Sequence, residues 1–78
     1  MELVIYPNPT SGMLTIKTRQ INTSAQLTVV DLRGQIVYND FVGNTTETID
    51  LSGLQTGVYF VQINTGEQIV TKKVTISH

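Results

Sequence analysis

The side chains of this sequence that could act as general acids, general bases or metal ligands are six carboxylates and a single histidine, and there is no cysteine. The histidine is the last residue, His78, where we expect fraying of the chain end to prevent it from serving as a positioned base. Without a placed histidine or any cysteine, neither a Ser-His-Asp triad nor a Cys-His pair can be assembled. The sequence therefore predicts a protein that is not an enzyme and carries no cofactor.

Two of the carboxylates, Asp31 and Asp50, each stand three residues before a glycine, at the start of an expected turn. Aspartates in this position commonly accept hydrogen bonds from backbone N–H groups of their own turn. The alternative is a shared calcium site, which needs about six to eight oxygen ligands. We expect the structural role for both residues, and no metal site.

The charge distribution excludes several classes of partner. The net charge is −1, and the longest basic run is the pair Lys72 and Lys73. Nucleic-acid-binding proteins need a larger basic surface, and so do polybasic membrane anchors. No apolar stretch reaches the ~20 residues that a membrane-spanning helix requires. We therefore expect no nucleic-acid partner and no membrane span.

The elements that must position these residues are strands. Apolar residues alternate with polar ones along most of the chain, as in MLTIKT at 13–18, and no window repeats them at helical spacing. Turn-forming residues separate the runs about every eleven residues, the spacing typical of an all-β sandwich. Seven short strands are expected, at residues 2–6, 13–19, 25–31, 35–42, 45–51, 57–64 and 67–76.

The alternation also predicts which side chains form the core. The expected inward positions are Val4, Leu14, Ile16, Leu27, Val29, Val37, Ile49, Leu51, Leu54, Tyr59, Val61, Ile63, Val74 and Ile76. The last strand resists this pattern, because burying Val74 and Ile76 in one phase also points Lys72 inward. We therefore expect a β-bulge near Thr71.

The segment YPNPTSG at 6–12 is the most constrained part of the chain. Each proline favours extended geometry in the residue before it and cannot donate to a sheet ladder. We expect a stiff corner that ends the first strand and protects a sheet edge from pairing with another chain. Two glycines near strand starts, Gly34 and Gly57, are expected to be required by the backbone, through positive φ or close approach.

Four motifs in order give the chain a family resemblance. They are Tyr6-Pro7-Asn8-Pro9 with Gly12, the turn from Asp31 to Gly34, the segment with Leu54, Gly57 and Tyr59, and Lys73 in the final strand. The resemblance that they carry extends over residues 3–76. The combination resembles the C-terminal sorting domain of the type IX secretion system of Bacteroidetes.

This resemblance implies a fold, a function and partners. It implies a small immunoglobulin-like antiparallel β-sandwich that serves as a non-catalytic address behind a secreted cargo protein. The cargo would cross the periplasm and reach the cell surface or the extracellular space. The implied partners are the outer-membrane translocon with its shuttle and sortase components. The resemblance places translocon recognition on the last strand, at Lys72, Lys73, Val74 and Ile76.

Under this interpretation, residues 1–78 are one C-terminal sorting domain taken from a larger protein, and the domain is expected to be a monomer. The alternative is a generic immunoglobulin-like or fibronectin-like surface module that binds carbohydrate or protein. Exposed aromatic side chains on one face would favour that alternative, because sugar binding uses stacking platforms.

Overall fold

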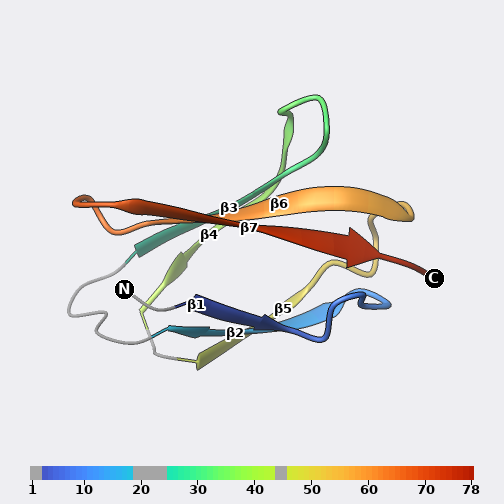
Figure 1. Ribbon diagram of the computed structural model, residues 1–78, viewed down its shortest axis with the longest axis horizontal. Coiled ribbons are helices and arrows are strands. Elements are labelled where there is room, and N and C mark those ends of the chain that lie inside the picture. Colours follow the sequence, from blue (N-terminus) through green and yellow to red (C-terminus); the bar gives the residue numbers. More distant parts are fainter. Residues whose placement is uncertain (1–2, 19–24, 44–45) are drawn as a thin grey trace.

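The computed structural model describes residues 3–18, 25–43 and 46–78, which form two antiparallel sheets packed face to face (Figure 1). The strands are β1 (Leu3–Tyr6), β2 (Met13–Thr18), β3 (Ala25–Val30), β4 (Ile36–Val42), β5 (Thr46–Asp50), β6 (Gly57–Asn64) and β7 (Ile69–Ile76). Sheet one has the order β1-β2-β5, and sheet two has the order β4-β3-β6-β7. The expected all-β sandwich is confirmed. The expected strand residues 2, 19 and 45 lie outside the described residues.

The core lies between the sheets and follows the expected alternation closely. The expected inward residues that are buried are Leu14, Ile16, Leu27, Val29, Ile49, Leu51, Tyr59, Val61, Ile63, Val74 and Ile76. Two more, Val37 and Leu54, are half-buried and pack against this core. Period-two alternation therefore predicts the core well wherever a strand has one apolar and one polar face.

The first strand has the opposite phase to the one expected. Val4 is 45% exposed, whereas its neighbour Leu3 is only 6% exposed and joins the core. Both faces of the four-residue strand LVIY are apolar, so alternation alone could not choose between them. The pairing with β2 decides the phase, because Ile5 lies opposite the buried Ile16. Leu3, two residues before Ile5, lies on the same face of the strand and is therefore also directed to the core.

The register shifts between β3 and β4, not in the last strand. Val29 pairs with Tyr38 but Val30 pairs with Ile36, so β4 carries an extra residue at this point. The bulge explains why both Val37 and Tyr38 pack against the core, although strict alternation would bury only one of them. Further along, the chain buries Ala25 and Val42, which pair with each other and which alternation did not identify.

The bulge expected near Thr71 is absent, and that prediction was wrong. The register of β6 with β7 runs without interruption from Gly57↔Ile76 to Asn64↔Ile69. Lys72 shares the inward phase of Val74 but remains exposed. This is possible because β7 is the outer strand of sheet two, where a long side chain can turn from the core side towards solvent.

Candidate functional site

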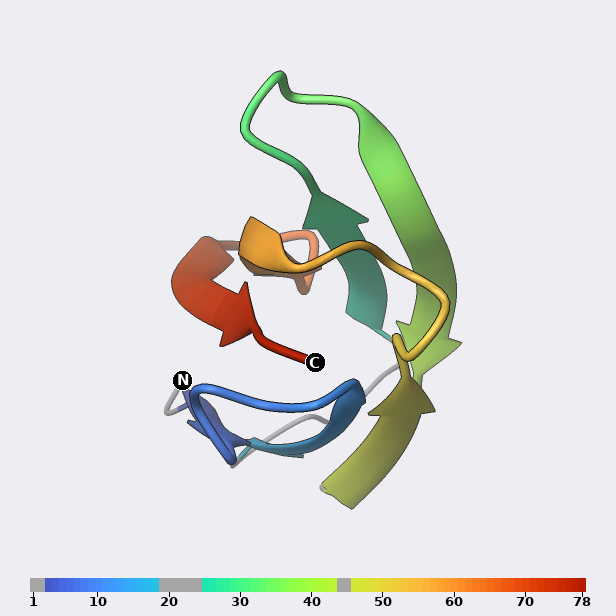
Figure 2. The ribbon, with the colours of Figure 1, turned by 90° about the vertical axis from the view of Figure 1, so that its right-hand side faces the viewer.

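The C-terminal strand β7 and the N-terminal segment 7–10 form one structural unit. In both views β7 (red) lies on the same side of the sandwich as β1 (dark blue), above it (Figures 1 and 2). The chain leaves β1 in sheet one and reaches the outer edge of β7 in sheet two, where Thr10 forms a parallel bridge with Ile76. We call residues 7–10 the strap.

Asn8 binds the edge of β7 in the manner of a neighbouring strand. Its Nδ2 donates to the carbonyl oxygen of Lys73 at 3.2 Å, and its Oδ1 accepts from the N–H of Thr75 at 3.1 Å. The side-chain amide thus replaces the donor and the acceptor that a peptide group would supply. The flanking bonds Tyr6–Pro7 and Asn8–Pro9 are both cis.

Thr10 completes the strap, and the sequence analysis did not identify it. Its N–H donates to the Thr75 carbonyl at 2.9 Å, and its carbonyl accepts from the Ser77 N–H at 2.8 Å. Its hydroxyl donates to the Met13 carbonyl at 2.6 Å and accepts from the Gly12 N–H at 3.1 Å. A hydroxyl residue two positions before a turn glycine is a recognisable signal for such a turn. The corner thus covers part of the β7 edge, through Asn8 and Thr10.

Gly12 anchors the other end of this corner to sheet one. Its φ is +139°, and a Cβ placed there would lie 2.6 Å from the Cα of Ser52. Its carbonyl accepts from the N–H of Leu51 at 2.7 Å. Two features therefore exclude a side chain at position 12: the positive φ and the backbone of Ser52. The motif YPNPTSG ties β7 of sheet two to the turn after β5 of sheet one.

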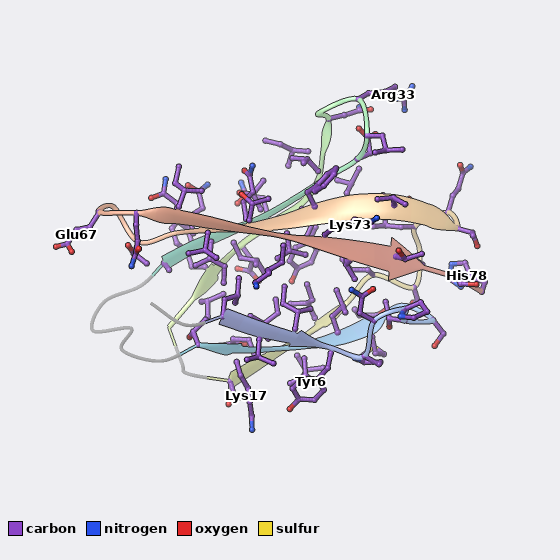
Figure 3. All side chains as sticks on the ribbon, viewed as in Figure 1. Tyr6, Lys17, Arg33, Glu67, Lys73 and His78 are labelled. Atoms are coloured by element: carbon purple, nitrogen blue, oxygen red, sulfur yellow. The ribbon has the colours of Figure 1, made fainter. Side chains whose placement is uncertain are left out.

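The four residues expected to carry recognition separate into two pairs. Val74 and Ile76 are completely buried, so a partner cannot reach their side chains in the folded domain. Lys72 and Lys73 are exposed. Lys73 lies on the outer face of sheet two, in register with Phe60, and Lys72 lies on the opposite face, in register with Val61. Figure 3 shows Lys73 on sheet two, far from Lys17 and Tyr6, which point outward from sheet one.

Asp31 serves the connection between β3 and β4. Its Oδ1 accepts from the N–H groups of Arg33 at 2.9 Å and Gln35 at 3.0 Å, and Arg33 also forms an ion pair with the carboxylate at 3.5 Å. The bond from Gln35, with those from Arg33, lowers the pKa of the Asp31 carboxyl below its ordinary value. Gly34 in the same turn has φ +84°, as expected.

Asp50 has the same kind of role after β5. Its Oδ1 accepts from the Ser52 N–H at 2.9 Å, and hydrogen bonds from the side chain and backbone of Ser52 lower the pKa of its carboxyl. Within residues 3–18, 25–43 and 46–78, no three acidic or histidine side chains gather where a metal ion could bind. The geometry supports turn stabilisation by both aspartates rather than the calcium alternative.

The expectation for Gly57 was wrong. This residue has no positive φ, and an added Cβ would meet the Tyr59 ring at an ordinary contact distance of 3.8 Å. Gly57 begins β6 in regular pairing with Ile76, so its backbone is one that other residues adopt. Tyr59 itself is buried, and its hydroxyl donates to the Gln55 carbonyl at 2.7 Å.

The chain end is attached to the same region, contrary to the expectation that His78 would fray. Its N–H donates to the hydroxyl of Thr56 at 3.3 Å, and its Nε2 lies 2.7 Å from the carbonyl oxygen of Leu54. These contacts hold the end of the chain against the loop between β5 and β6. The described part of the chain contains no apolar helix of membrane-crossing length.

Comparisons with known proteins agree with this geometry. A crystal structure of a DUF3244 family protein with an immunoglobulin-like β-sandwich fold, from Bacteroides vulgatus ATCC 8482, superposes with a TM-score of 0.81 at 18% identity. The match covers 96% of this chain and 84% of that one, and shows that the fold is immunoglobulin-like. Among curated proteins, none matches the chain. The profile of the family described as "Secretion system C-terminal sorting domain" matches residues 4–77. The chain therefore belongs to the family of C-terminal sorting domains of type IX secretion.

Proposed function

We propose that this domain directs an N-terminally linked cargo protein across the outer membrane, followed by attachment to the cell surface or release. The family match over residues 4–77 carries the proposal. The domain acts as a folded address and not as a catalyst. Its partners are the translocon, shuttle and sortase components of the type IX machinery, which it meets after transit through the periplasm.

Within this function, we assign recognition to the exposed part of β7. Val74 and Ile76 hold the strand in the core, whereas Lys72 and Lys73 are available to a partner. The strap fixes the position of these lysines, because Asn8 binds the carbonyl of Lys73 directly. The recognition role of Val74 and Ile76 is accordingly indirect, through the placement of the strand.

A reporter experiment tests the proposal. Residues 1–78 fused behind a fluorescent reporter with a periplasmic signal peptide should bring the reporter to the surface of a host with type IX machinery. Lys73→Ala should reduce export without lowering the melting temperature, because the side chain is exposed. Lys17→Ala is the matched control, an exposed lysine on the outer face of the other sheet that should not affect export.

Deletion of residues 72–78 is the more severe variant. It removes five of the eight residues of β7, including the buried Val74 and Ile76, and should leave the reporter in the periplasm. Equal export of the intact and truncated reporters would overturn the sorting function.

One observation favours the second candidate, a module that binds carbohydrate. Phe41 is 70% exposed on β4, opposite Gln26, whose amide donates to the Asn39 side chain at 3.2 Å. An exposed ring beside amides is suited to stacking and hydrogen bonding with a sugar. If Phe41→Ala abolished binding of the isolated domain to a polysaccharide while the reporter was not exported, this candidate would replace the first.

A further inference from the structure

The outer edge of β7 is only partly covered. The backbone groups of β7 that point away from β6 bind the strap near the end of the chain. They are the carbonyl of Lys73, the N–H and the carbonyl of Thr75, and the N–H of Ser77. By the alternation of an antiparallel ladder, Ile69 and Thr71 face the same way. Among the residues that the structure describes, none forms a hydrogen bond with these outward groups of Ile69 and Thr71.

This uncovered stretch, from Ile69 to the N–H of Lys73, is here called the open edge. It is regular, because the register of β6 with β7 is unbroken along it. The strap ends there because the chain turns away into β1 of sheet one. The covered half of β7 shows that this edge accepts an extended chain, since Thr10 already pairs with Ile76 there.

The charges beside the open edge indicate the chemistry of a partner. β7 carries two lysines and no acid, and the strap is uncharged. The nearest carboxylate along the chain is Glu67, in the turn before β7. Two copies pairing through this edge would bring four lysines together, which disfavours self-association. An acidic segment would instead be attracted to Lys72 on one face of the strand and Lys73 on the other.

We propose that the open edge accepts an extended, acidic segment of a component of the export machinery, which adds to sheet two as a fifth strand beside β7. Main-chain hydrogen bonds to Thr71 would supply binding, and the two lysines would select for acidic side chains. This inference rests on the proposed sorting function and specifies how the sorting signal is read.

Thr71→Pro tests the proposal in the reporter assay. Proline removes the outward N–H, and an edge strand tolerates it because the ladder with β6 does not use that group. Export should fall by about fivefold or more, the factor that one lost main-chain hydrogen bond corresponds to. The matched control is Asn39→Pro on β4, the other outer strand of sheet two. The N–H of Phe41 points away from β3, to the Asp40 side chain, and by alternation the N–H of Asn39 also points away from β3. This variant should be exported like the wild type.

A charge-reversal pair keeps the test decisive if Thr71→Pro fails to fold. Lys72→Glu combined with Lys73→Glu changes two exposed side chains and should reduce export more than it reduces the melting temperature. Lys17→Glu, which reverses one exposed lysine on sheet one, is the control for charge reversal away from β7. If the paired reversal and Lys17→Glu had equal effects on export, the acidic partner would be excluded.

The remaining outcomes separate this inference from the function on which it rests. Absence of export by the wild-type domain would overturn the sorting function itself. Export by folded Thr71→Pro at the wild-type level would overturn the open-edge proposal and leave the sorting function standing. Sedimentation of the purified domain tests whether a second copy of the domain pairs with the open edge. A wild-type dimer that Thr71→Pro abolishes would mean that a second copy, not an acidic partner, covers the edge.

Discussion

The two outer strands of sheet two, β4 and β7, end the same sheet in different ways. A bulge interrupts β4 near Ile36, and the Asp40 side chain accepts the outward N–H of Phe41 at 2.8 Å. β7 is regular over all eight residues and is covered by a separate segment of chain over only half its length. Bulges and local capping discourage strand addition, whereas a regular uncovered edge permits it. The difference teaches that, of these two strands, β7 is the one that offers a regular backbone edge to a partner, and it does so next to two lysines.

The largest expected effect concerns the packing that supports β7. Tyr59 lies opposite Val74 in the ladder and is buried. Tyr59→Ala should lower the free energy of unfolding by about 3 kcal/mol or more, in the range of large aromatic truncations. Urea denaturation measures the loss. Tyr59→Phe is the matched control: it removes only the bond to Gln55 and should cost about 1 kcal/mol. Equal losses in the two variants would contradict burial of the ring as the main contribution.

The second effect is the loss of stability on replacing a glycine, which should be larger at Gly12 than at Gly34 or Gly57. Gly12→Ala introduces a Cβ against the Ser52 backbone at positive φ and should cost at least about 2 kcal/mol. Gly34→Ala, in the turn before β4, has positive φ but open space, and should cost about 1 kcal/mol. Gly57→Ala should be nearly neutral. Thermal denaturation of the three variants gives the order, and a Gly57 variant less stable than the Gly12 variant would refute it.

The third effect tests the strap on β7 directly. Asn8→Ala removes two exposed hydrogen bonds and should reduce the free energy of unfolding by about 1 kcal/mol. Amide hydrogen exchange of Thr75 should become faster, because its N–H loses its acceptor. The amide of Phe41 on β4 should be unaffected and serves as the internal reference. Unchanged exchange at Thr75 would mean that the strap does not depend on Asn8.

The smallest effect lies on the β4 side, at Asp31. Its carboxyl has a lowered pKa in the folded domain, so ionised Asp31 stabilises the fold above its unfolded pKa of about 3.8. That stabilisation is lost as the pH falls through the lower folded pKa. Asp31→Asn should therefore melt at a lower temperature than the wild type at pH 7, and the difference should shrink below pH 3.8. A difference in melting temperature that is independent of pH would contradict the assignment.

Much of the fold was predictable because most strands have one apolar and one polar face. Leu14 and Ile16 in β2, and Tyr59 and Val61 in β6, could be placed in the core from alternation alone. The prediction failed where that contrast was missing. The short strand LVIY is apolar on both faces, so its phase could not be predicted. In the last strand the phase of Val74 and Ile76 was predicted correctly, but the adjacent lysines suggested a bulge that is not there.

The candidate site was predictable in its parts but not in its assembly. Asn8 and Lys73 were both recognised as motif residues, yet 65 positions separate them, and nothing local indicates that one binds the other. Thr10 was missed because its backbone bonds to Thr75 and Ser77 exist only once β7 lies beside it.

By itself, the sequence determined the class of fold, the strand boundaries to within two residues, the turn roles of Asp31 and Asp50 and the family. These depend on local properties: alternation, turn chemistry and the order of short motifs. Only the tertiary structure decided which half of the β7 edge is covered, that Val74 and Ile76 are inaccessible while Lys72 and Lys73 are exposed, and that the bulge belongs to β4. The physical reason is that edges, burial and register arise from pairing between distant segments, and a peptide group has the same chemistry in the sequence whether or not another strand covers it.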